Sequence, residues 1–257
     1  MAKFEVISKK THSDKRWKRF VSFSFAGKDA ICPLVAKEMP TAMMCLPIGF
    51  VRQGSTYVPV AIQGLIPEHN LLVAADGNWL GRYIPEAYRA YPFRMLDTDD
   101  GKKALCFDSE SGLLSDDLAD ERFFDEDGEP SHFVSDTANF LLNNSASRDA
   151  TSTICEELDS HKLFETWPIT AQIGEENVEV NGLSRINETA LNELCATDFA
   201  SLRDSRALTV AYCQLLSMQH LEQIVRLANN VAAPAPLTDE VLFGSQDEND
   251  TLCFDNF

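Results

Sequence analysis

The sequence predicts an α+β fold, with short antiparallel strands and hairpins in the N-terminal half and a helix-rich C-terminal half. Two observations predict these halves: β-rich runs separated by turn residues before residue 110, and an apolar stripe at helical spacing after residue 205. A third observation is the apolar content of 44%, with 16 Phe in 257 residues. This composition can supply a substantial core and is not typical of a disordered chain.

Charge and composition divide the chain into three expected parts. The first is a basic segment over residues 1–19, because seven Lys or Arg stand against two acids near this end. A single α+β domain should cover residues 20–231, with subregions of about 20–130 and 131–231. An Ala/Pro linker and an acidic tail occupy residues 232–257. The tail is either a flexible terminus or a segment whose Phe and Leu side chains dock on a partner or on its own domain.

The first expected strand is Arg19–Phe25. Its residues alternate in character, which predicts that Val21, Phe23 and Phe25, or their neighbours, face inward. The Ala-, Met- and Leu-rich segment Val35–Cys45 then predicts a short helix.

A hairpin is expected next. The β-rich runs Ile48–Arg52 and Tyr57–Ile62 are joined by a connection that contains Gly, which is typical of a hairpin. Leu71–Ala74 predicts another short strand, followed by a turn. Ile84–Tyr91 predicts a short helix with Pro85 in its first turn.

Helices are expected to dominate the second half. Their patterns predict helices over Ser131–Leu142 and Thr151–Phe164, and two short strands within residues 168–185. Asn187 is a suitable N-cap for a following helix.

The longest apolar stripe of the chain follows residue 205. Its members recur at spacings of three and four and are Leu208, Ala211, Tyr212, Leu215, Met218, Leu221, Val225 and Ala228. This pattern predicts one amphipathic helix, capped by Asp204 or Ser205.

Charge and targeting signals limit the compartment and the partners. The net charge of −18 disfavours nucleic-acid binding, which needs a positive surface to displace counterions. No apolar stretch is suited to a signal peptide or approaches the ~18 residues of a membrane span. The seven cysteines are scattered and form no CxxC pair, which favours reduced thiols. The sequence therefore predicts a cytoplasmic protein without a membrane span.

The sequence contains no recognisable catalytic, phosphate-binding or metal-binding motif. No HExxH, GxxxxGK[ST], GxGxxG or GxSxG pattern occurs, so we expect neither a metal nor a cofactor, and the catalytic residues stay unknown. Asp97–Gly101 and Asp125–Gly128 imitate parts of a calcium loop, but Gly stands at the wrong position. Solvated turns are the favoured interpretation, with a weak divalent-cation site as the alternative. A Cys–His pair that meets only in the fold stays open.

Arginines and aromatic residues interleave between residues 79 and 93. This combination is enriched at recognition surfaces and can hold an acidic or aromatic ligand. The candidate binding residues are Arg52, Trp79, Arg82, Tyr83, Tyr88, Arg89 and Tyr91. The alternative is structural: the rings fill the core and the arginines pair with nearby acids.

Several blocks in order resemble the SapC family over roughly residues 20–230. The blocks are Leu46-Pro47-Ile48, Phe50-Val51-Arg52, Tyr57-Val58-Pro59-Val60-Ala61, Gly64-Leu65, Asn70-Leu71, Trp79, Gly81-Arg82-Tyr83-Ile84-Pro85, Tyr91-Pro92-Phe93, Val180-Asn181-Gly182-Leu183 and the helix around Ala211–Met218. The resemblance implies a bacterial protein with a role alongside surface-layer genes, and association with outer-membrane-receptor and halogenase genes. It implies no catalytic residues.

Two functional hypotheses follow. The first is a non-enzymatic accessory or binding protein that holds a partner protein or a small ligand. The second is an enzyme with an unrecognised site, acting on a small aromatic or halogenated metabolite. The absence of catalytic motifs favours the first hypothesis. A deep pocket with convergent Arg, Tyr and His side chains would favour the second.

Overall fold

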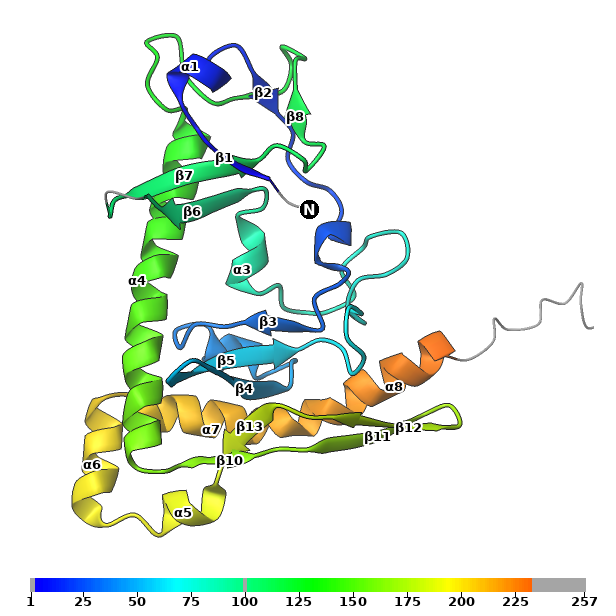
Figure 1. Ribbon diagram of the computed structural model, residues 1–257, viewed down its shortest axis with the longest axis vertical. Coiled ribbons are helices and arrows are strands. Elements are labelled where there is room, and N and C mark those ends of the chain that lie inside the picture. Colours follow the sequence, from blue (N-terminus) through cyan, green and yellow to red (C-terminus); the bar gives the residue numbers. More distant parts are fainter. Residues whose placement is uncertain (1–2, 99–100, 233–257) are drawn as a thin grey trace, which may run out of the picture.

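The computed structural model describes residues 3–98 and 101–232, which form an α+β fold (Figure 1). Every strand pair within these ranges is antiparallel. Every described helix longer than five residues follows residue 130. The predicted fold class is therefore confirmed. None of the described helices is both long and apolar enough to cross a membrane. The predicted acidic tail lies outside the described residues.

The largest sheet has five strands in the order β10-β13-β4-β5-β3. They are β10 (Phe164–Thr166), β13 (Leu183–Ile186), β4 (Ile48–Gln53), β5 (Thr56–Ile62) and β3 (Ile31–Pro33). The predicted hairpin is formed by β4 and β5. Its turn uses Gly54 at a φ of +62°, a left-handed conformation that Gly adopts without strain.

Two smaller sheets lie above the first in Figure 1. One has the order β1-β7-β6, and the other places β2 between β8 and β9. The strands are β1 (Phe4–Val6), β6 (Phe93–Asp97), β7 (Lys103–Asp108), β2 (Arg16–Trp17), β8 (Leu114–Ser115) and β9 (Glu121–Arg122). The short helix α1 (Lys9–His12) connects β1 to β2. The amino-terminal segment predicted to be basic, residues 1–19, therefore contributes one strand to each of these two sheets.

The strand predicted over Arg19–Phe25 is wrong. The structure has only a 3₁₀ turn there, η1 (Ser24–Ala26), and Val21 is 92% exposed. The three Phe rings gather together instead of alternating, since the centroid of Phe20 lies 5.3 Å from both Phe23 and Phe25. Aromatic contact thus replaces strand pairing in this segment.

The connection after the hairpin is mostly irregular. The strand predicted over Leu71–Ala74 is reduced to one bridge, between Val73 and Trp79. α2 (Met39–Ala42) lies within the predicted helical segment Val35–Cys45. α3 (Glu86–Arg89) is shorter than predicted, with Pro85 at its N-cap.

One long helix, α4 (His132–Ser160), replaces the two helices predicted in this region. Residues 143–150 contain weak helix formers but neither Gly nor Pro. Tertiary contacts hold the helix together, because Thr137, Asn144 and Thr151 are buried at intervals of seven residues on one face. The Thr151 hydroxyl also accepts a 2.8 Å hydrogen bond from the Ala36 amide. Packing therefore overrides local preference.

The elements after α4 follow the predicted order. They are β11 (Ile169–Ile173), β12 (Glu176–Val180), α5 (Glu188–Asn192), α6 (Ala196–Asp204), α7 (Ala207–Ser217), the 3₁₀ turn η2 (Met218–His220) and α8 (Leu221–Ala232). The Asn187 side chain accepts from the Ala190 amide at 2.9 Å, as predicted for an N-cap. The cap predicted for the last helix is wrong, because Arg206 holds that position in a left-handed conformation.

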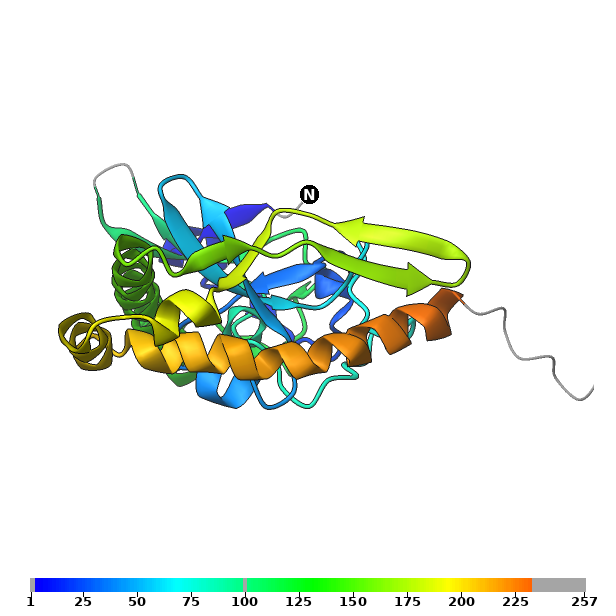
Figure 2. The ribbon, with the colours of Figure 1, turned by 90° about the horizontal axis from the view of Figure 1, so that it is seen from below.

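The single helix predicted after residue 205 is broken into α7, η2 and α8. The Ser217 hydroxyl donates to the Gln214 carbonyl at 2.6 Å and accepts from the Ile48 amide at 2.9 Å. In a continuous α-helix the Met218 amide would donate to the Gln214 carbonyl. Here it donates to the Leu215 carbonyl instead. Because Ser217 bonds to both Gln214 and β4, the end of α7 tightens into the 3₁₀ turn η2. Figure 2 shows α8 beside the β11–β12 hairpin, where Asn229 bonds the Gly174 amide at 2.8 Å.

Buried apolar residues form two clusters. The larger one surrounds the five-stranded sheet and includes Leu158 of α4 and Ala211 of α7. The smaller one consists of Trp17, Phe93, Phe107, Phe123, Phe124 and Val134. α4 contributes to both clusters and runs past both groups of strands in Figure 1.

Candidate ligand-binding site

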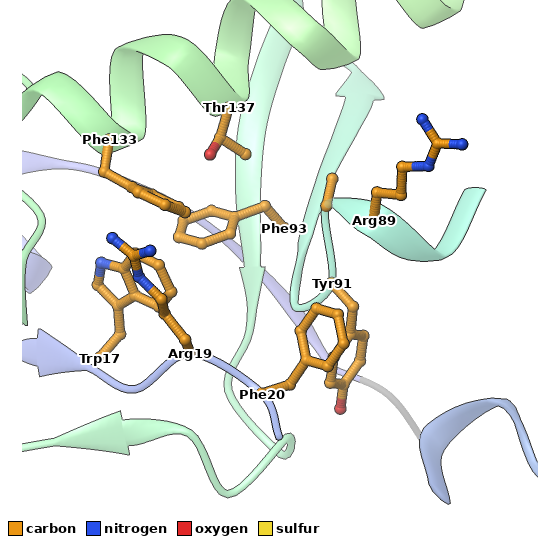
Figure 3. A pocket seen from close by; sticks show the side chains of 9 residues that line it. Trp17, Arg19, Phe20, Arg89, Tyr91, Phe93, Phe133 and Thr137 are labelled. Atoms are coloured by element: carbon orange, nitrogen blue, oxygen red, sulfur yellow. The ribbon is translucent and has the colours of Figure 1, made fainter. Parts of the chain in front are cut away.

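A cavity of about 230 Å³ lies at the smaller cluster, between the segment after β2, the segment after α3, and the start of α4 (Figure 3). We call it the aromatic cavity. Its lining residues are Trp17, Arg19, Phe20, Arg89, Ala90, Tyr91, Phe93, Phe133 and Thr137. Five of these side chains are aromatic, and two are arginines.

The inner wall of the aromatic cavity is rigid. Trp17 is only 1% exposed, and its ring centroid lies 4.9 Å from Phe93 and 4.8 Å from Phe133. Phe93 packs edge-on against Phe107 at 5.2 Å in the same cluster. The rings are therefore held in place by the core behind them.

The opposite wall consists of Phe20 and Tyr91. Their ring centroids are 6.0 Å apart. Tyr91 stacks on Phe25 at 3.7 Å with an interplanar angle of 8°. Phe20 belongs to the Phe cluster that replaced the predicted strand, and Tyr91 packs against that cluster. That cluster thus supplies one side of the aromatic cavity.

Arg19 brings a positive charge to the aromatic cavity. Its guanidinium carbon lies 4.4 Å from the centroid of Phe133, in a cation–π arrangement. The Glu121 carboxylate accepts hydrogen bonds from Nε at 3.1 Å and from Nη2 at 2.8 Å. Both side chains are exposed, so this ion pair is weak and exchangeable.

Arg89 and Thr137 complete the lining. The Nε atom of Arg89 donates to the Ile84 carbonyl at 3.1 Å, and Figure 3 shows its guanidinium turned away from the rings. No carboxylate of the described residues lies within ion-pair distance of Arg89. The Thr137 side chain is nine-tenths buried, and its hydroxyl forms no hydrogen bond within the part of the chain that is described.

Tyr83, one of the predicted binding residues, lies in the core. Its hydroxyl donates to the buried Glu38 carboxylate at 2.7 Å. Glu38 also accepts from the Val35 amide at 2.9 Å and from the Glu86 amide at 2.9 Å. Burial, followed by the hydrogen bond to Glu38, raises the pKa of Tyr83. Glu38, at the start of α2, thus holds both Tyr83 and the first residue of α3.

Tyr88 lies in a second buried network. Its hydroxyl donates to the Gln63 side-chain oxygen at 2.9 Å, and Asn70 donates to the same oxygen at 3.0 Å. The Gln63 Nε2 atom is buried and has no partner among the described residues. Burial is the largest cause that raises the pKa of Tyr88, so the phenol stays neutral.

The other predicted residues are dispersed. Trp79 is half-buried and donates from Nε1 to the Tyr83 carbonyl at 3.1 Å. Arg82 is exposed, and Arg52 lies 5.7 Å from the Tyr57 ring at the end of the hairpin. Of the seven predicted residues, the structure brings only Arg89 and Tyr91 to the aromatic cavity. Ligand binding by these residues stays a prediction.

The buried thiols are poorly suited to nucleophilic chemistry. Desolvation by burial raises the pKa of Cys32 to about 12, and that of Cys155 also to about 12. A thiol with such a pKa contains almost no thiolate at neutral pH. The six cysteines in the described ranges are free. Within those ranges, no three His, Cys, Asp or Glu side chains converge as a metal site would require.

Sequence reasoning missed most of the aromatic cavity. Trp17, Arg19 and Phe20 lie in a segment interpreted as the end of a basic terminus and the start of a strand. A usable signal was present, because Arg19 and its aromatic neighbours repeat the interleaving found after residue 79. Phe133 gave no such signal, since only the fold of α4 brings it near Arg19.

The fold and the cavity define an α+β protein whose small aromatic cavity lies at the smaller buried cluster, beside the start of one long helix. The SapC family model matches residues 7–224. The chain therefore belongs to the SapC family. No curated protein and no solved structure shows significant similarity to it.

Proposed function

We propose that this protein is a binding protein that holds a single-ring aromatic acid in the aromatic cavity. The observation that carries the proposal is that five aromatic side chains line the aromatic cavity together with the guanidinium of Arg19. Aromatic rings provide apolar surface with a defined geometry, and a guanidinium matches a carboxylate.

The size of the aromatic cavity supports a small ligand. Its volume is about 230 Å³. A dry cavity of roughly 150 Å³ is enough for benzene, and pockets for drug-sized ligands begin at about 300 Å³. One ring with one small polar substituent fits between these limits.

The polar groups of the aromatic cavity suit a carboxylate on that ring. Arg19 can exchange Glu121 for the ligand, because their ion pair is exposed to solvent. The Thr137 hydroxyl lines the aromatic cavity, has no partner among the described residues and can donate to a ligand oxygen.

The lining chemistry favours binding over conversion. Among the described residues that line the aromatic cavity there is no carboxylate, imidazole or thiol. General acid–base catalysis and covalent catalysis use such groups most often. The enzyme hypothesis is therefore less supported than the binding hypothesis. A role alongside surface-layer genes stays a prediction from the family resemblance.

Titration with three matched compounds tests the proposal. At about 0.5 to 0.9 kcal/mol for each of its roughly nine non-hydrogen atoms, benzoate would bind with a Kd of about 1 µM to 1 mM. Benzyl alcohol lacks the charge and cyclohexanecarboxylate lacks the aromatic ring, so both should bind more weakly. NMR signals of the Trp indole groups locate the ligand, because Trp17 lines the aromatic cavity, whereas Trp79 and Trp167 do not.

Two results would contradict the proposal. One is equal affinity for all three compounds. The other is a benzoate-induced shift at Trp79 or Trp167 with none at Trp17. An unchanged benzoate spectrum after long incubation would distinguish binding from conversion.

A further inference from the structure

The outer edge of β1 is open. The Ile7 amide bonds to the Leu105 carbonyl at 2.9 Å, and the Ser109 amide bonds to the Lys3 carbonyl at 2.9 Å. Alternate residues of an antiparallel strand direct their backbone groups to opposite sides, so those of Phe4 and Val6 point away from β7. No hydrogen bond to these outward groups occurs in the part of the chain that is described. Such an edge is a template for another strand.

An apolar groove of about 470 Å³ adjoins this edge, between the β1–β7 pair and α4. Val6, Ile7 and Leu105 contribute one side, and Phe124, Val134 and Ala138 contribute the other. Val6 is 53% exposed. Exposed apolar surface beside an open edge is the arrangement that binds an extended peptide, in which alternate side chains enter a pocket.

Positive charge borders the groove. Lys9 and Lys10 begin α1, two and three positions after Ile7. The Nζ atom of Lys9 lies 3.4 Å from Oε1 of Glu129, and both side chains are exposed. Lys10 has no carboxylate within ion-pair distance among the described residues. An acidic occupant would therefore gain favourable charge contacts here.

We propose that Thr251–Phe257 of this chain adds to the outer edge of β1, with Leu252 and Phe254 in the groove. Residues two apart on a strand face the same side, so these two apolar side chains enter together. Asp250 and Asp255 flank them and can meet the lysines of α1. This proposal does not depend on the aromatic cavity.

The connecting chain is long enough. Leu252 lies 20 residue steps beyond Ala232, the end of α8. At about 3.3 Å per step this connection extends to roughly 66 Å. α4 has 29 residues, and at about 1.5 Å per residue it is roughly 43 Å long. The connection therefore exceeds the length of α4, which joins the lower and upper parts of the molecule in Figure 1.

Hydrogen exchange in the full chain tests the proposal. In the double variant Leu252→Asp/Phe254→Asp, the added strand should no longer bind. The amides of Phe4 and Val6 should then exchange about tenfold faster than in the parent, because they lose the hydrogen bonds that they donate to this strand. The matched control Val241→Asp/Phe243→Asp adds the same charge outside the proposed strand and should leave both rates unchanged. Equal rates in the parent and in both variants would overturn the proposal.

A second measurement uses Cys253, which lies in the proposed strand. Val6→Pro removes the outward amide without breaking a bond to β7, so it should prevent strand addition and speed Cys253 alkylation several-fold. Val6→Thr keeps the amide and should leave alkylation slow. Alkylation unaffected by Val6→Pro would contradict the proposal. Protection that rises with chain concentration would also contradict it, because binding would then occur between copies.

Discussion

Arg19 is shared between the ring of Phe133 and the carboxylate of Glu121. A ligand carboxylate must displace Glu121 from the guanidinium. Removing the competing charge should therefore favour the ligand.

Glu121→Gln should raise the affinity for benzoate by up to about fivefold, since exposed ion pairs are worth about 1 kcal/mol at most. Calorimetric titration of the parent and the variant measures the change. Glu126→Gln is the control, because Glu126 pairs with Arg122, which does not line the aromatic cavity. An unchanged or lower affinity in Glu121→Gln would contradict the prediction.

His12 makes stability depend on pH. The residue is buried against Phe123 at a ring distance of 5.0 Å, and burial lowers its pKa below 6.5, opposed by the nearby charge of Glu5. The unfolded chain therefore binds this proton at a higher pH than the folded chain does. The folded state with a neutral His12 is fully favoured above about pH 6.5. This contribution to the free energy of unfolding is lost as the pH falls through the pKa of His12 in the folded protein.

Urea unfolding between pH 7.5 and 5 should show this loss in the parent. His12→Gln should reduce the dependence on pH, whereas His132→Gln, at an exposed position, should retain it. The same pH slope in His12→Gln as in the parent would exclude His12 as the cause.

Tyr83 was predicted to bind a ligand, but its hydroxyl bonds to the buried Glu38. Tyr83→Phe should lower the free energy of unfolding by about 1.5 to 3 kcal/mol, the usual cost for a hydrogen bond to a charged group. Benzoate affinity should not change. Thermal and urea unfolding measure the first effect and calorimetric titration the second. A binding loss at unchanged stability would instead support the prediction made from the sequence.

At the scale of elements, α4 depends on side-chain hydrogen bonds that local sequence does not reveal. Thr151 accepts from the Ala36 amide at 2.8 Å. Thr151→Val keeps the shape but leaves that amide without its partner, so it should cost about 1 to 3 kcal/mol of unfolding free energy. Thr153→Val is the control, because its hydroxyl bonds only within α4, to the Asp149 carbonyl at 3.3 Å. Equal effects of the two substitutions would contradict the prediction.

Elements with strong local signals were predicted well. The β4–β5 hairpin has a Gly-containing turn, and α5 begins at a capping Asn187. The failures occurred where distant contacts compete with local pattern. Phe20 joins an aromatic cluster instead of a strand, and Ser217 bonds to β4 instead of continuing the helix. Periodicity describes one face of an element but not the partner that the face will meet.

At the scale of the whole molecule, α4 connects the two apolar clusters and should couple their unfolding. Leu158 lies in the larger cluster, and Phe107 lies in the smaller one. Leu158→Ala should cost about 2 to 5 kcal/mol. Hydrogen exchange should then accelerate equally for the slowest amides of β5 and β7, because they share one global transition. Acceleration confined to β5 would show two independent units.

The sequence by itself determined the α+β class, the hairpin, the Asn187 cap of α5 and the membership suggested by the SapC blocks. Each of these depends on residues that are close in the chain. Only the tertiary structure decided that Tyr83 and Tyr88 are core residues, and that Arg19, Tyr91 and Phe133 meet around one cavity. The physical reason is that a cavity is defined by side chains from distant segments. Their meeting depends on how complete elements pack.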